Sequence, residues 1–113
     1  MDYYIVNLSH LKATDKYVTV WRPECKGYAW PLSWAGRYAE EEVLAHLDYY
    51  NSGDNIAVPC SILEGMAIAP AAGDIDNNAG PVVLNNAETW RVILPAVIVP
   101  PVHPAKPKYR KTA

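Results

Sequence analysis

Long hydrophobic runs are missing from this chain of 113 residues. Its longest apolar stretch, residues 92–102, contains three prolines, and at eleven residues it is too short to cross a bilayer. The first ten residues, MDYYIVNLSH, lack the basic segment and the apolar run of a signal peptide. We therefore expect a soluble protein that works in the cytoplasm and does not contact a membrane.

Cysteine, histidine and the motifs of catalysis are equally scarce. The two cysteines, Cys25 and Cys60, do not form a C-x-x-C motif. Without export we expect both to be reduced, with a disulfide between them as the alternative. The three histidines stand apart from one another, and the chain has no glycine-rich phosphate loop, zinc ligand set or G-x-S-x-G motif. The sequence therefore predicts a protein that is not an enzyme, with no catalytic residue and no cofactor.

One segment has part of the spacing of a calcium-binding loop. Asp74, Asp76 and Asn78 occupy its first, third and fifth positions, and hard cations prefer such oxygen ligands. The twelfth position is Asn85, where a calcium loop needs a bidentate glutamate, and no helix leads into the segment. We expect a polar turn and no metal site. A small ligand-binding module or enzyme around Cys60 or this segment is kept as an alternative function.

Charge divides the chain into two parts. Residues 1–99 contain six Lys and Arg against twelve Asp and Glu, whereas residues 100–113 contain four Lys and Arg and no acid. An acidic body does not favour nucleic acid, because phosphate contacts need clustered cations. We expect one compact domain over residues 1–99 and a proline-rich basic tail over residues 100–113. The tail has few apolar side chains, so it should add little stability.

Hydrophobic patterning predicts strands in the first half of the chain. β-Branched and aromatic residues cluster in four short segments, which we assign as strands at residues 3–8, 17–21, 28–30 and 55–59. The first three follow one another through polar links and turn formers. They therefore predict a small N-terminal antiparallel β-meander.

The clearest helix pattern covers residues 39–50. Val43, Leu44, Leu47 and Tyr50 form a narrow apolar stripe, and three glutamates occupy the first turn, where they oppose the helix dipole. Shorter helices are expected after Pro59 and over residues 87–94, the latter with Asn85 or Asn86 as its N-cap. The expected fold is α+β, with the β-meander packed on one main α-helix and followed by short C-terminal elements.

The chain has no phenylalanine, and its large rings are four tryptophans and eight tyrosines. Two of each fall in KGYAWPLSWAGRY, residues 26–38. We expect Trp30 to belong to an aromatic plug between sheet and helix, because a buried ring removes about 150–250 Å² from water. The same stretch is a candidate binding surface, since Trp, Tyr and Arg are enriched in interface hot spots. The candidate partner-binding residues are Arg22, Tyr28, Trp34, Arg37, Glu40 and Glu41.

Four segments carry a resemblance to known proteins: KYVTVWRPECKGYAWPLSWAGRY, EEEVLAHLDYYNSG, NIAVPCSILE and GDIDNNAGPVV. They resemble a group of small phage and prophage proteins of uncharacterised function. The resemblance covers about residues 3–101 and is most specific in W-R-P…K-G-Y-x-W-P-L…A-G-R-Y. It implies a bacterial host cell and brings no activity or catalytic residues with it.

Small phage proteins commonly act by binding one host protein. Applying this to the present chain is an analogy with that class of proteins, and no motif carries it. By this analogy we expect a non-enzymatic protein that binds and inhibits a bacterial defence complex, of the CRISPR–Cas or restriction type. A nucleic-acid-binding accessory protein is the alternative. Whether the protein is a homo-oligomer stays open.

Overall fold

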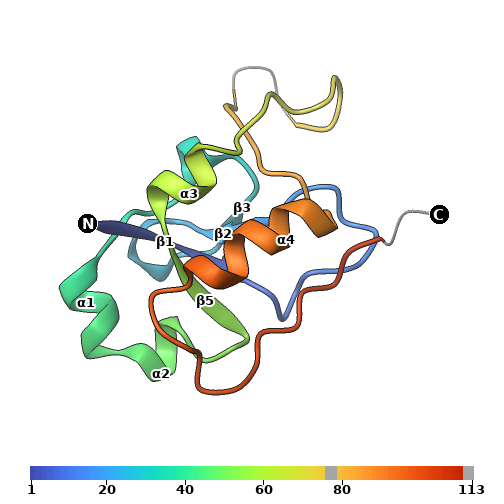
Figure 1. Ribbon diagram of the computed structural model, residues 1–113. Coiled ribbons are helices and arrows are strands. Elements are labelled where there is room, and N and C mark those ends of the chain that lie inside the picture. Colours follow the sequence, from blue (N-terminus) through green and yellow to red (C-terminus); the bar gives the residue numbers. More distant parts are fainter. Residues whose placement is uncertain (76–78, 111–113) are drawn as a thin grey trace.

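An antiparallel sheet of five strands forms the centre of the protein (Figure 1). The computed structural model describes residues 1–75 and 79–110. The strands are β1 (Asp2–Asn7), β2 (Thr19–Trp21), β3 (Tyr28–Ala29), β4 (Tyr38–Ala39) and β5 (Asn55–Pro59). Short helices cover both faces of this sheet, so the α+β class predicted from the sequence is confirmed.

Strand β1 is paired along both of its edges. On one edge β5 runs antiparallel to residues 3–7. On the other edge β2 pairs with the end of β1, with Val6 opposite Val20, and β4 pairs with its beginning, with Tyr3 opposite Tyr38. Strand β3 is antiparallel to β2 on its outer side. The consecutive strands β1, β2 and β3 are therefore the predicted β-meander.

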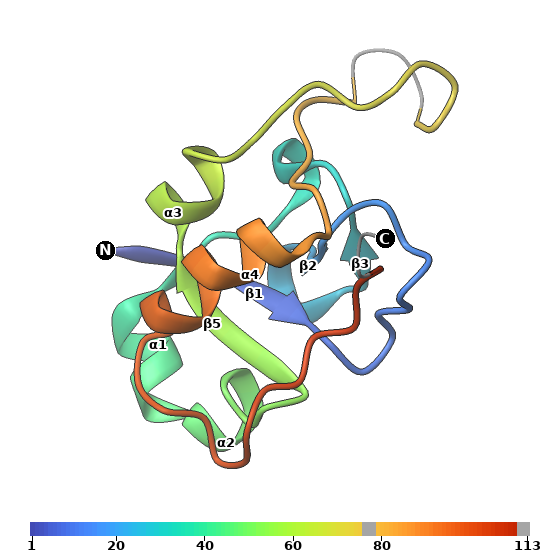
Figure 2. The ribbon, with the colours of Figure 1, turned by 45° about the vertical axis from the view of Figure 1, so that its right-hand side comes forward.

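Alternation along β1 sends its side chains to two separate cores. The helices are α1 (Glu40–Ala45), α2 (Leu47–Tyr50), α3 (Cys60–Glu64) and α4 (Ala87–Ile93). Tyr4 and Val6 are buried in the main core, together with residues of α3 and α4. Tyr3 and Ile5 are buried on the opposite face, together with residues of α1 and α2. Figures 1 and 2 show α4 crossing in front of β1 and β5, so the sheet is the middle of three layers.

The single main helix of the prediction is interrupted. Its start is weak as expected, because Ala39 makes no side-chain hydrogen bond at the N-cap. His46 then leaves helical geometry, with φ −138° and ψ 50°, and separates α1 from α2. Beyond the break, the ring centroid of Tyr50 lies 5.8 Å from that of Trp21 and 5.4 Å from that of Tyr38. Aromatic packing thus overrides the local preference for one continuous helix.

Helix α4 lies where the sequence predicts a helix. Asn86 is its N-cap, and the side-chain oxygen accepts a hydrogen bond of 2.9 Å from the backbone N–H of Thr89. The helix ends at Ile93, and a 3-10 turn that contains Pro95 follows. Proline has no N–H to continue the helix, which explains this end. The inner face of α4 places Trp90 in the main core.

The predicted aromatic stretch supplies Tyr38, and not Trp30, to the plug between sheet and helices. Trp21, Tyr38 and Tyr50 are buried together between the sheet and the helices α1 and α2. Trp30 is only half-buried and packs edge-to-face against Tyr17, with ring centroids 5.6 Å apart. Strand β3 ends at Ala29, so Trp30 lies at the margin of the sheet rather than beneath a helix.

The described part of the tail lies along the body (red in Figure 2). The N–H of Val102 donates to the carbonyl of Asn51 at 3.2 Å, and Asn51 Nδ2 donates to the carbonyl of Val99 at 2.9 Å. Ala105 and Tyr109 pack against the main core. This differs from the expectation of a tail that buries little, because much of the docking uses backbone hydrogen bonds that apolar content does not reveal.

Candidate functional site

A strained turn joins β2 to β3 and fixes the side chains at its ends. Glu24 and Cys25 have φ values of 58° and 57°, which residues other than glycine rarely adopt. The buried phenol of Tyr38 holds this turn, because it accepts from Cys25 N at 2.9 Å and donates to Arg22 O at 2.5 Å. Such a conformation persists only where its surroundings impose it. The backbone positions of Arg22 and Tyr28, at the two ends of the turn, are therefore fixed.

Three of the predicted partner-binding residues come together at this hairpin. The guanidinium of Arg22 lies 5.1 Å from the centroid of the Trp34 ring, and Arg22 Nε donates to Tyr28 O at 2.9 Å. Trp34 is 37% exposed and Tyr28 is 45% exposed. The attraction between the guanidinium and the ring orients the Trp34 side chain. We call Arg22, Tyr28 and Trp34 the hairpin surface; it is an exposed aromatic surface with its side chains already ordered.

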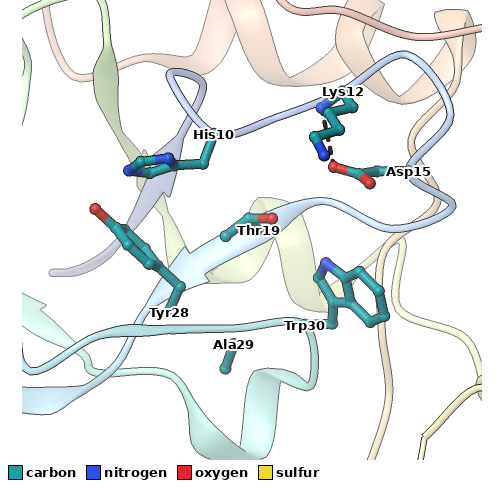
Figure 3. Close-up of a pocket in the computed structure, with 7 residues that line it drawn as sticks. All are labelled: His10, Lys12, Asp15, Thr19, Tyr28, Ala29 and Trp30. Carbon is teal, nitrogen blue, oxygen red and sulfur yellow. Dashed lines mark hydrogen bonds between the residues drawn. The ribbon is translucent and has the colours of Figure 1, made fainter.

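A hollow of about 390 Å³ adjoins the hairpin surface and shares Tyr28 with it (Figure 3). Its other main lining residues are His10, Lys12, Asp15, Thr19 and Trp30. Figure 3 shows His10 and Tyr28 at one end of the hollow and Trp30 at the other, with Thr19 between them. Aromatic rings at the ends and polar groups between them suit an amphipathic side chain or small group.

One wall of the hollow is the loop between β1 and β2. Asp15 Oδ2 accepts a hydrogen bond of 2.9 Å from Lys12 N, drawn as a dashed line in Figure 3. His10 reaches the hollow at the other end of the loop, and its ring centroid lies 5.1 Å from that of Tyr28. His10, Lys12 and Asp15 were not among the candidate partner-binding residues predicted from the sequence. No local motif marks them, because only the pairing of β1, β2 and β3 brings His10 to Tyr28.

The other three predicted residues lie near the beginning of β1. Arg37 Nη1 forms an ion pair of 2.8 Å with Glu64 Oε2. Glu40 Oε1 accepts a hydrogen bond of 3.1 Å from the phenol of Tyr3. Glu41 is exposed in the first turn of α1. Arg37 and Glu40 thus have partners within the chain, whereas the hairpin surface presents its rings to solvent.

Behind Trp30, the side chain of Tyr17 ties the long loop after α3 to the sheet. The Tyr17 hydroxyl donates to Asp74 Oδ2 at 2.7 Å and accepts from Ala71 N at 2.9 Å. Lys16 Nζ lies 3.1 Å from the same carboxylate oxygen. The hydrogen bond from Tyr17, followed by that from Lys16, holds the pKa of the Asp74 carboxyl below its usual range.

We expect Tyr17→Phe to weaken the acid dependence of stability. A carboxyl whose pKa is lowered by folding adds stability that is fully present above its unfolded pKa of about 3.9. This stability is lost as the pH falls through the lower, folded pKa. The variant removes the largest cause of the shift at Asp74, so its melting temperature should fall less steeply below about pH 4. Tyr109→Phe is the matched control, and equal slopes in wild type and Tyr17→Phe would contradict the assignment.

The two cysteines lie in different surroundings. Both are free thiols in the structure, with Cys25 exposed and Cys60 buried. Burial raises the pKa of the Cys60 thiol to about 11, so it stays protonated at neutral pH and is a poor nucleophile. Within the described residues, no three His, Cys, Asp or Glu side chains are grouped to hold a metal ion. Asp76 and Asn78 of the calcium-loop spacing lie outside the described residues.

The fold and this site define the protein as a small α+β protein with an ordered aromatic surface beside a hollow of mixed polarity. Comparisons with protein-family models, with curated proteins and with solved structures find no match to the chain. Over residues 1–75 and 79–110, no helix has the length and apolar character needed to cross a membrane. The assignment of a function therefore depends on the site itself.

Proposed function

We propose that this protein binds another protein through the hairpin surface and the adjoining hollow. The observation that carries the proposal is the exposed Trp34 ring held beneath the guanidinium of Arg22, 5.1 Å from its centroid. Trp, Tyr and Arg dominate the binding energy of many interfaces. A ring that is already ordered loses little conformational freedom when a partner covers it, which favours affinity.

Charge favours a protein partner over nucleic acid. Up to residue 99, acidic side chains outnumber basic ones by twelve to six. Around the hollow, Lys12 stands beside Asp15, and Lys16 is engaged by Asp74. Among the described residues around the hollow, these cations are interspersed with acids and do not form the row of cations that phosphate contacts require.

The resemblance to small phage proteins directs the proposal to a bacterial defence complex of the CRISPR–Cas or restriction type. The protein would inhibit this complex by covering a surface that the complex needs. Inhibition of this kind requires stable binding alone. Such inhibition therefore needs no catalytic group in the site, and the ordered aromatic surface and the hollow are sufficient for it.

Trp34→Ala is the sharpest test of this function. The ring is partly exposed, so we expect the melting temperature to change by only a few degrees. Binding should weaken about 30-fold, which corresponds to about 2 kcal/mol for a hot-spot tryptophan. Plaque counts on cells that carry defined CRISPR–Cas or restriction systems identify the system that is inhibited. Calorimetry with its purified complex then measures the affinity.

Val92→Ala is the matched control, because Val92 is also exposed but lies on α4. It should leave both inhibition and affinity unchanged. The proposal is wrong if no system in the panel is inhibited, or if Arg22→Ala and Trp34→Ala inhibit as strongly as the wild type. A loss of affinity of about a thousandfold between 50 and 200 mM salt would favour the nucleic-acid alternative instead.

A further inference from the structure

Asn85 connects three segments that are far apart in the sequence. It is 7% exposed, and its side chain is fully engaged in hydrogen bonds. Trp90 Nε1 donates to Asn85 Oδ1 at 2.7 Å. Asn85 Nδ2 donates to the carbonyl oxygens of Asp15 and Lys108, each at 3.0 Å. Its backbone N–H donates to the carbonyl of Lys16 at 2.8 Å.

The two hydrogens of this amide serve different parts of the protein. One is directed to Asp15, in the wall of the hollow, and the other to Lys108, in the tail. Next to Lys108, Tyr109 packs against the main core and lines a pocket together with Trp90. The tail and the wall of the hollow are therefore joined through one buried side chain.

We propose that Asn85 is a positioning residue for the binding site. With the tail docked, it holds residues 12–16 as the wall of the hollow; when the tail is displaced, this wall is released. The docked tail then supports the hollow, and displacement of the tail should weaken binding of the partner. The proposal rests on the proposed function, because it concerns how that same site is kept ready.

Asn51 provides a matched control within the chain. It is also a buried asparagine close to the tail: its Nδ2 donates to Val99 O, one residue before the tail begins, at 2.9 Å, and its Oδ1 accepts from Ala57 N at 3.1 Å. In the described part of the chain it makes no side-chain hydrogen bond to residues 12–16 and does not line the hollow. Substitution at Asn51 therefore disturbs the residue that leads into the tail and leaves the contact between Asn85 and Lys108 unchanged.

Asn85→Asp tests the proposal in the full-length chain. The change keeps an acceptor for Trp90 and replaces the amide donor by an oxygen that faces two carbonyl oxygens. We expect the NMR signals of the amides of residues 12–16 and of the Trp30 indole to shift, and binding to weaken about tenfold. Asn51→Asp should leave these signals in place and the affinity within about twofold.

Tyr109→Ala keeps the test decisive if Asn85→Asp does not fold, because it loosens the tail and leaves Asn85 unchanged. The same signals should shift. The proposal is overturned if they stay in place in the folded variants, or if Asn51→Asp moves them equally. It is also overturned if they shift without loss of binding while Trp34→Ala does weaken binding. If Trp34→Ala leaves binding intact as well, the proposed function fails, and the signals alone decide the positioning role.

Discussion

Trp90→Ala is expected to lower the free energy of unfolding by about 3–5 kcal/mol. The Trp90 side chain is 2% exposed and lies in the main core, between α4 and the sheet. Its removal leaves a cavity and also leaves Asn85 Oδ1 without the indole donor at 2.7 Å. A buried acceptor without a partner adds about 1–3 kcal/mol to the loss. Because domains of this size are stable by about 5–15 kcal/mol, the variant should lose a large fraction of its stability.

Trp30→Ala is the control for this prediction. The same type of side chain is removed, but Trp30 is half-buried beside Tyr17, so we expect less than half of the loss. Urea unfolding followed by circular dichroism measures both variants, and the midpoint is compared at equal slope. Equal losses in the two variants would show that Trp30 is a core residue, as the sequence predicts, and would contradict its place at the margin of the sheet.

Gly36→Ala should destabilise the protein by about 3 kcal/mol, the upper end of the range for over-packing. A Cβ atom on Gly36 would lie 2.7 Å from Pro23 Cα and 2.9 Å from Pro23 N. Both are backbone atoms, so the contact is not relieved by rotating a side chain. The N–H of Gly36 donates to Trp21 O at 2.8 Å and keeps the two segments in contact. The added methyl group should push them apart.

Gly36→Ala should also affect the binding site. Pro23 belongs to the strained turn after β2, and Gly36 follows the segment of Trp34 by two residues. Separating them should move Arg22 away from Trp34, so binding should weaken together with stability. Gly65→Ala is the control, because the nearest atom to its Cβ is Ser61 O at 3.3 Å, and it should change stability by less than about 1 kcal/mol. Comparable melting temperatures for the two variants would contradict the close contact.

The amino-acid sequence by itself determined the α+β class and most of the elements. The alternation of β1 needs only the period of a strand, and it correctly separates Tyr4 and Val6 from Tyr3 and Ile5. The end of α4 needs only the chemistry of Pro95, which lacks an N–H. The three glutamates that open α1 act within one turn. In each case, the signal and the structure that it specifies lie within a few residues of each other.

The tertiary structure alone decided which of these elements meet, and so where the candidate site lies. No residue near His46 in the sequence predicts the break after α1. The contacts that accompany the break join Tyr50 to Trp21 and Tyr38, which lie on strands distant in the sequence. Composition marked Arg22, Tyr28 and Trp34 as candidate partner-binding residues, but their mutual contacts depend on a turn that Tyr38 holds.

The hollow and its support by Asn85 were beyond prediction for the same reason. An asparagine side chain bonds equally well to many backbone groups, and its type does not say which ones. Asn85 joins the wall of the hollow to the tail because the sheet and α4 bring Asp15 and Lys108 to either side of it. Strand period and helix period tell which face a residue occupies. Which residues stand opposite that face depends on strand pairing and core packing between distant segments, and that is encoded in no single stretch of the chain.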